Sequence, residues 1–157
     1  MLDTIDHQLL ALLQDNCLLS YGELGERVGL SVSAVNERLK KLRAQGVIRR
    51  SVAIVDPQAL GLHVCAFVEV SIERAKRVAV FAKEMQARPE VLECHRLAGN
   101  ATYLLKVRVP SNADLERFLT EQVLSARGIA RTRVTVVLAT KKEETRIALP
   151  AAAKEAK

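Results

Sequence analysis

The sequence has little of what marks secreted, disulfide-bonded or membrane-spanning proteins. Its three cysteines, Cys17, Cys65 and Cys94, are an odd number without a pairing pattern, so we expect no disulfide framework and a reducing cytoplasm. The N-terminal residues 1–6 are acidic rather than basic, which argues against a secretory signal. No uncharged apolar run approaches the roughly 18–20 residues needed to cross a bilayer. The expectation is a cytoplasmic protein with no membrane partner.

Common signatures of catalysis and cofactor binding are also missing. The sequence contains no Ser-His-Asp order, phosphate-binding loop or dinucleotide-binding glycine pattern, so no catalytic residue and no cofactor are predicted. Two short pairs, His63 with Cys65 and Cys94 with His95, carry side chains that suit zinc. Each pair belongs to a different expected strand, and the two strands are not neighbours in the sheet predicted below. We therefore predict no metal site.

What is present is ordinary globular composition with unevenly placed charge. The chain has 157 residues, of which 49% are hydrophobic and 27% charged, with a formal net charge of +6. This is enough apolar material for one domain of usual size or two small ones. Residues 1–56 are net neutral, yet their seven basic residues all lie in 27–50 with Glu37 as the single acid. A basic block on a short helix indicates nucleic-acid binding better than net charge does, although a solvated helix face is the alternative.

The N-terminal third predicts three helices. Apolar residues at helical spacing predict a first helix over 3–15. Ser20 and Glu23 have the capping-box spacing and begin a short second helix, which Gly29 ends in a left-handed conformation. Ser31 is the candidate N-cap of a third helix. Two helices joined by a tight glycine turn and preceded by a supporting helix form the helix-turn-helix layout.

The third helix presents a polar face that can reach DNA. Val35, Leu39 and Leu42 form its buried stripe, and the opposite surface carries amide, carboxylate and ammonium groups. Such groups pair with base edges and phosphates. The candidate DNA-binding residues are Tyr21, Ser31, Ser33, Asn36, Glu37, Arg38, Lys40 and Lys41.

From residue 47 the pattern becomes extended. β-Branched residues predict a connecting strand over 47–55, followed by a turn at Asp56–Pro57. The predicted division is a DNA-binding domain 1–50, a linker strand and turn 51–62, a second domain 63–149 and a flexible tail 150–157.

The second domain predicts an α+β unit. The expected elements are strands 64–72, 91–97, 103–109 and 129–138, helices 74–86 and 113–124, and a further short strand around 145–149. Their order is βαββαβ, the ferredoxin-like unit. Two helices cover one sheet face, and apolar residues such as Val134 to Leu138 favour sheet-on-sheet dimerisation through the other face. A two-fold dimer would present two DNA-reading helices to two half-sites.

Several segments in order carry a family resemblance. They are Leu2–Asp6, Glu23–Ser31, Glu37–Leu42, Gly46–Ile48, Glu93–His95, Gly99 and Tyr103–Pro110. Over nearly all of 2–149 the chain resembles the Lrp/AsnC (feast/famine) transcriptional regulators. The resemblance implies a winged helix-turn-helix joined to a ligand-sensing βαββαβ domain of the RAM type. It further implies double-stranded DNA as partner, and homodimers that assemble further, often to octamers.

The resemblance also implies an amino-acid effector bound between dimers, beside the loop that precedes the strand 103–109. In the family this loop usually reads Gly-Asp-aromatic-Asp-Tyr, whereas 99–103 here reads Gly-Asn-Ala-Thr-Tyr. A carboxylate at this place would suit an effector's ammonium group, and both carboxylates are replaced. Three alternatives remain open: a different effector, weaker binding, or regulation without one. The candidate effector-binding residues are Gly99, Asn100, Ala101, Thr102, Tyr103, Thr132 and Val134.

We therefore expect a sequence-specific DNA-binding transcriptional regulator, modulated by an amino acid or related small molecule, and not an enzyme. Two alternatives stay open. One is a sirohaem decarboxylase-like enzyme on the same two-module fold, for which His95 and Arg96 are the only candidate residues. The other is an architectural protein that wraps DNA with little sequence preference.

Overall fold

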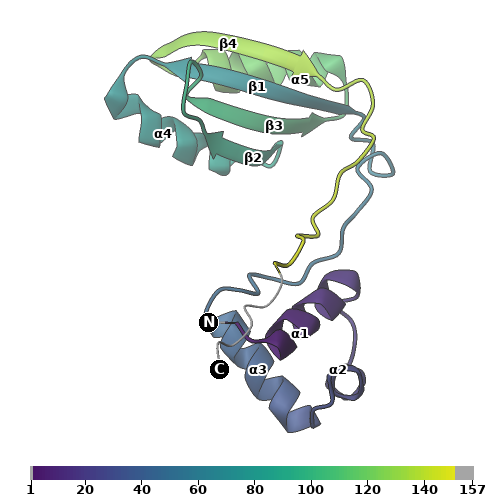
Figure 1. Ribbon diagram of the computed structural model, residues 1–157. Coiled ribbons are helices and arrows are strands. Elements are labelled where there is room, and N and C mark those ends of the chain that lie inside the picture. Colours follow the sequence, from purple (N-terminus) through teal and green to yellow (C-terminus); the bar gives the residue numbers. More distant parts are fainter. Residues whose placement is uncertain (1, 151–157) are drawn as a thin grey trace. The chain divides into compact units, whose positions relative to one another are not determined.

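The computed structural model describes residues 2–150, which form two compact units (Figure 1). The first unit combines the chain up to Ile54 with the segment that starts at Lys142, and the second runs from Val55 to Lys141. Of the predicted tail 150–157, the residues after 150 lie outside the described part of the chain. Within residues 2–150, no helix has the length and hydropathy to cross a membrane.

The first unit contains the three predicted helices, α1 (Thr4–Asp15), α2 (Tyr21–Val28) and α3 (Val32–Ala44). The capping box is confirmed: the Glu23 N–H donates to Ser20 Oγ over 3.2 Å, and the Ser20 N–H donates to Glu23 Oε2 over 2.7 Å. Gly29 ends α2 with φ 71°, as expected for a left-handed cap. The helix-turn-helix prediction is thereby confirmed.

A small apolar core joins these helices. Its buried members are Leu9, Leu10, Leu24, Val35, Leu39 and Leu42. The turn between α2 and α3 passes very close to Gly25, whose carbonyl accepts from the Leu30 N–H over 2.9 Å. A Cβ at this glycine would stand 2.4 Å from the Leu30 carbonyl oxygen. Glycine at position 25 therefore lets the turn close tightly and sets α3 against α2.

The predictions of a connecting strand over 47–55 and of a short strand at 145–149 are wrong. After α3 the backbone first turns back: the N–H groups of Val47 and Ile48 both donate to the Leu42 carbonyl. Beyond them Val52, Ile54 and Val55 are largely exposed. A β-branched run forms a strand only where another strand pairs with it, and within the described chain no strand pairs with 47–55. No wing hairpin therefore follows α3 in residues 2–150.

The second unit has the predicted βαββαβ order. Its elements are β1 (Val64–Ile72), α4 (Ala75–Gln86), β2 (Val91–Arg96), β3 (Tyr103–Val109), α5 (Asn112–Phe118), the π-helical turn η1 (Leu119–Leu124) and β4 (Ile129–Val136). The predicted helix 113–124 thus changes at Leu119 to a π-helix. The four strands pair antiparallel in the order β2-β3-β1-β4, which is the ferredoxin-like arrangement (Figure 1).

Both helices cover the same face of this sheet. Ala66, Val68 and Val70 of β1 are fully buried there, against Phe81 of α4 and Phe118 of α5. The alternate residues of β1, including Phe67 and Glu69, lie on the other face.

The strand register corrects the expectation for Val134 to Leu138. Val134 lies opposite Val68 and Val136 lies opposite Ala66. Both valines therefore belong to the helix-covered face and not to the open one. The open face of β4 instead carries Arg131, Arg133 and Thr135, which pair across with the open face of β1.

Candidate DNA-binding and effector sites

The surface of α3 that faces away from the core carries four of the predicted residues. Ser33, Glu37, Lys40 and Lys41 are exposed, and Asn36 is half-buried beside them. Lys40 Nζ lies 3.1 Å from Glu37 Oε1, one turn away. Because both side chains are well exposed, this ion pair holds them weakly, and both remain available to a partner.

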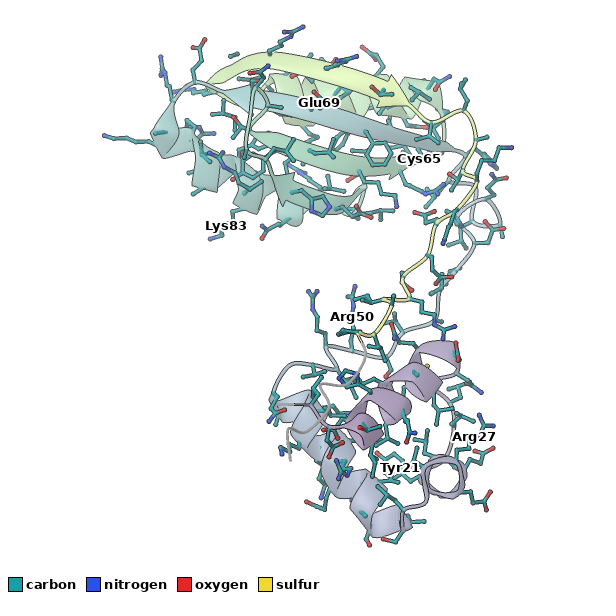
Figure 2. All side chains as sticks on the ribbon, in the orientation of Figure 1. Tyr21, Arg27, Arg50, Cys65, Glu69 and Lys83 are labelled. Carbon is teal, nitrogen blue, oxygen red and sulfur yellow. The ribbon has the colours of Figure 1, made fainter. Side chains whose placement is uncertain are left out.

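Two other predicted residues have local roles. The Ser31 hydroxyl accepts from the Ala34 N–H over 3.2 Å and so caps α3, and it lies 3.0 Å from Ser33 Oγ. Tyr21 stands at the first position of α2 (labelled in Figure 2), and its hydroxyl accepts from Arg43 Nη1 over 3.3 Å. Arg43 was not among the predicted residues. Its position two helical turns after Asn36, on the same flank of α3, is the signal that could have found it.

Arg38 turns toward α1 and away from the exposed surface of α3. Its Nη1 donates to Asp3 Oδ2 over 2.6 Å and to Asp6 Oδ1 over 2.8 Å. The backbone N–H of Asp6, followed by the Arg38 guanidinium, lowers the pKa of Asp3, and the two carboxylates raise the pKa of Arg38. Asp6 is 8% exposed, so this cation compensates a nearly buried charge. Arg38 joins α3 to α1.

The loop before β3 is fastened to the end of β1. Thr102 Oγ1 accepts from the Ile72 N–H over 2.9 Å, and the Thr102 N–H donates to the Val70 carbonyl over 2.7 Å. Ser71 Oγ donates to the Asn100 carbonyl over 3.0 Å. Gly99 has φ 135°, a conformation that favours glycine. The neutral Thr102 side chain therefore serves the fold by satisfying a backbone donor where β1 changes register.

Tyr103 belongs to the core of the second unit. It is 7% exposed, and its hydroxyl donates to the Val78 carbonyl of α4 over 3.1 Å. Its ring centroid lies 5.8 Å from that of Phe81, and the Arg96 guanidinium lies 5.3 Å from the Tyr103 ring. The ring fixes α4 against the sheet.

Thr132 lies at the same end of the sheet as the loop. Val70 is the register partner of both Tyr103 and Thr132, so the two flank one residue from opposite sides. Thr132 Oγ1 is buried, and within residues 2–150 it has no hydrogen-bond partner. A buried hydroxyl without a partner is costly. Val134 lies two residues further along β4, opposite Val68.

His95, a candidate residue in both the enzyme and the zinc alternatives, already contacts an acidic neighbour. His95 Nε2 lies 3.1 Å from Glu93 Oε2, whose other oxygen accepts from Lys106 over 3.1 Å. His95, and then Lys106, lower the pKa of Glu93. β3 separates β1, which carries Cys65 and directly follows His63, from β2, which carries Cys94 and His95. The two His-Cys pairs therefore do not lie on neighbouring strands, as predicted. The part of the chain that the structure describes contains no group of three or more His, Cys, Asp or Glu suited to a metal ion.

Two family models match the two parts of the chain. Residues 2–49 match a winged helix-turn-helix DNA-binding model, and residues 65–147 match the Lrp/AsnC ligand-binding domain. The second match alone covers more than half of the chain. The order of the two matches is that of the two structural modules.

Whole relatives are similar over nearly the full length. The leucine-responsive regulatory protein of Klebsiella pneumoniae is 35% identical over 94% of this chain and 92% of its own length. The HTH-type transcriptional regulator FL11 of Pyrococcus horikoshii is 34% identical over 93% of this chain and 95% of its own.

A solved structure extends the likeness to three dimensions. A transcriptional regulator from Neisseria meningitidis in complex with L-Met is 35% identical, with a TM-score of 0.88 over 94% of this chain and 97% of that one. Sequence, domain order and fold agree. The chain therefore belongs to the Lrp/AsnC family of transcriptional regulators, with a helix-turn-helix DNA-binding domain followed by a ligand-binding domain of that family.

Proposed function

We propose that this regulator reads specific DNA sequences with the exposed face of α3. The observation that carries the proposal is that one helix, whose opposite side is buried, carries two exposed lysines beside three polar residues: Lys40 and Lys41 with Ser33, Asn36 and Glu37. Lysines suit phosphates, and the amide and carboxylate suit base edges.

Four further residues take different places in this proposal. Ser31 and Tyr21 hold the surface in shape through the α3 cap and the contact with Arg43. Arg43 joins the proposed phosphate contacts. Arg38 is left out of them, because Asp3 and Asp6 already occupy its guanidinium.

Salt dependence of DNA binding tests the lysines. Lys40→Ala and Lys41→Ala should each weaken binding to a duplex obtained by in-vitro selection. Each should also reduce the slope of log K against log salt by about 0.9, because one phosphate contact is lost. Lys76→Ala, on α4 of the other unit, is the matched control with an unchanged slope. Slopes equal to wild type for both α3 variants would remove them as phosphate contacts.

Competition binding separates a sequence-specific regulator from an architectural protein. We expect the selected duplex to outcompete bulk genomic DNA by at least 10³-fold, as specific regulators do. A ratio near one would favour non-specific wrapping.

For the effector we propose a small molecule, an amino acid or a relative of one, beside the loop 99–103 and Thr132. The unpartnered Thr132 hydroxyl supports this place, and so does the family likeness to a regulator solved with L-Met. Since the loop carries no carboxylate, hydrogen bonds to neutral groups replace charge pairing with an ammonium group.

A thermal-shift screen against all amino acids tests the effector site, because a ligand that binds the folded state raises its melting temperature. Thr132→Val should abolish any shift, while Thr102→Asp should restore charge pairing and strengthen binding of an amino acid. A shift that survives Thr132→Val would place the effector elsewhere.

We further propose a cytoplasmic homo-oligomer, a dimer that assembles to an octamer, which acts without catalysis of its own. The open sheet face carries Phe67 and Leu104, which are half-buried in the single chain, and a second copy would cover them. Light scattering of the purified protein gives the size, and Phe67→Glu should reduce it. A Soret band in the purified protein would instead favour the sirohaem alternative.

A further inference from the structure

The outer side of α1 binds the chain's own C-terminal segment. Gln14 Nε2 donates to the Ile147 carbonyl over 3.1 Å, and the Ile147 N–H donates to Gln14 Oε1 over 2.7 Å. One amide side chain thus satisfies both backbone groups of one residue, as a neighbouring strand would. The Ile147 side chain itself is 71% exposed, so the backbone makes this contact.

Contacts continue in both directions from Ile147. Arg146 Nη1 lies 2.7 Å from Asp15 Oδ1 at the end of α1, and His7 Nδ1 lies 2.9 Å from the Pro150 carbonyl near its start. The segment 146–150 therefore runs antiparallel to α1. Between these ends Leu149 packs against the apolar cluster that α1, α2 and α3 share, so the segment contributes to the core of the DNA-binding unit.

The segment is also one end of a covalent connection between the two units. It continues from β4, which carries Thr132, through residues 137–145. The other connection, from α3 to β1, takes residues 45–63. Of the two covalent connections between the units, the shorter one therefore ends on α1.

We propose that residues 146–150 form a strap that docks on α1. The docked strap is required for the full stability and the full DNA affinity of the DNA-binding unit. The effect on DNA affinity rests on the proposed role of α3, whereas the docking does not.

Amide hydrogen exchange of the full chain tests the docking. Gln14→Ala should speed exchange of the Ile147 amide at least tenfold, because its acceptor is lost. Gln8→Ala, an exposed glutamine on the same helix, should leave that exchange unchanged. An Ile147 amide that exchanges at the unprotected rate in the wild type, or equally in both variants, would overturn the docking.

DNA binding tests whether the docked strap is required. Ile147→Pro removes the N–H that Gln14 accepts, whereas Ile147→Ala keeps it and removes only exposed side chain. We expect Ile147→Pro to lower the melting temperature of the DNA-binding unit by several degrees and to weaken binding to the selected duplex three- to tenfold. Ile147→Ala should match wild type. Equal affinity for the proline and alanine variants would refute this requirement.

One further variant separates this inference from the proposed function. Lys40→Ala should weaken DNA binding without changing Ile147 exchange. If the wild-type chain bound no DNA, the proposed function would fail. The exchange rate and the melting temperature would then still support or overturn the strap.

Discussion

The two units of this chain are held together by different means. In the first, six buried residues form the core, and capping hydrogen bonds, a tight glycine turn and the pairs of Arg38 with Asp3 and Asp6 supplement it. In the second, twelve buried residues from β1, β3, α4, α5 and η1 form one continuous core. Small domains bury a smaller fraction of their surface than large ones. The stability of the first unit, which binds DNA, therefore depends more on a few polar and backbone contacts. The stability of the second unit, called the sensing unit below, depends on apolar packing.

The largest effect should come from the apolar core of the sensing unit. Phe81 is 1% exposed, and Phe81→Ala should lower the free energy of unfolding of that unit by about 4 kcal/mol through the cavity it leaves. Denaturant unfolding followed by amide hydrogen exchange measures the stability of each unit separately. Val80→Ala, at a position 40% exposed on the same helix, is the control. If the amides of α1 lost protection from exchange to the same extent, the two units would unfold together. The contrast between their stabilising contacts would then not hold.

The next effect should come from the tight turn of the DNA-binding unit. Gly25→Ala forces a methyl group against the Leu30 carbonyl, with 2.4 Å available, and should destabilise this unit by about 3 kcal/mol. Gly22→Ala on the same helix meets nothing nearer than 3.8 Å and should stabilise it by about 0.5 kcal/mol. Thermal unfolding of both variants gives the sign. A harmless alanine at 25 would mean that the turn can open.

A smaller effect should follow loss of the polar contact between α3 and α1. Arg38→Ala leaves the nearly buried Asp6 without its cation, which should cost about 2 kcal/mol. Lys41→Ala, exposed on the same helix, should change stability by less than about 0.5 kcal/mol. If the two variants were equally stable, the ion pairs would contribute nothing and the units would differ less than we infer.

The smallest effect is a pH dependence. The pKa of Asp3 is lowered, chiefly by the Asp6 N–H. Ionised Asp3 therefore stabilises the first unit fully at pH values above its ordinary pKa near 3.8. This stabilisation is lost as the pH falls through the lowered pKa. Because the side chain is 44% exposed, we expect less than about 1 kcal/mol. Asp3→Asn should make the stability of the first unit depend less on pH below about 4, as urea titrations at several pH values would show.

Sequence reasoning worked where the determinants are close in the chain. The Ser20–Glu23 capping box, the Gly29 cap and the alternation of β1 each depend on neighbouring residues, and all were predicted. A strand over 47–55 was predicted wrongly because a strand needs a partner, which its own residues do not specify. The face of Val134 was assigned wrongly for a related reason. Alternation says that successive residues point oppositely, but only the register with β1 says which face is covered.

The candidate sites divide in the same way. The exposed face of α3 follows from helical spacing, so Ser33 and Lys40 were placed on the surface correctly. The pairing of Arg38 with Asp6 joins residues from two helices, and the contact of Gln14 with Ile147 joins residues 133 positions apart in the sequence. Neither leaves a local signal. Tyr103 looked like a site residue in the sequence pattern, and its hydrogen bond to Val78 shows its part in the core.

The first unit is built from two segments that are far apart in the sequence, and this has a consequence for biosynthesis. Residues 55–141 lie between its two parts, as an inserted domain does. Because synthesis proceeds from the N-terminus and domains fold as units, the ligand-binding unit is complete while the DNA-binding unit still lacks residues 142–150. In a newly made chain the ligand-binding unit can therefore fold completely before the DNA-binding unit does.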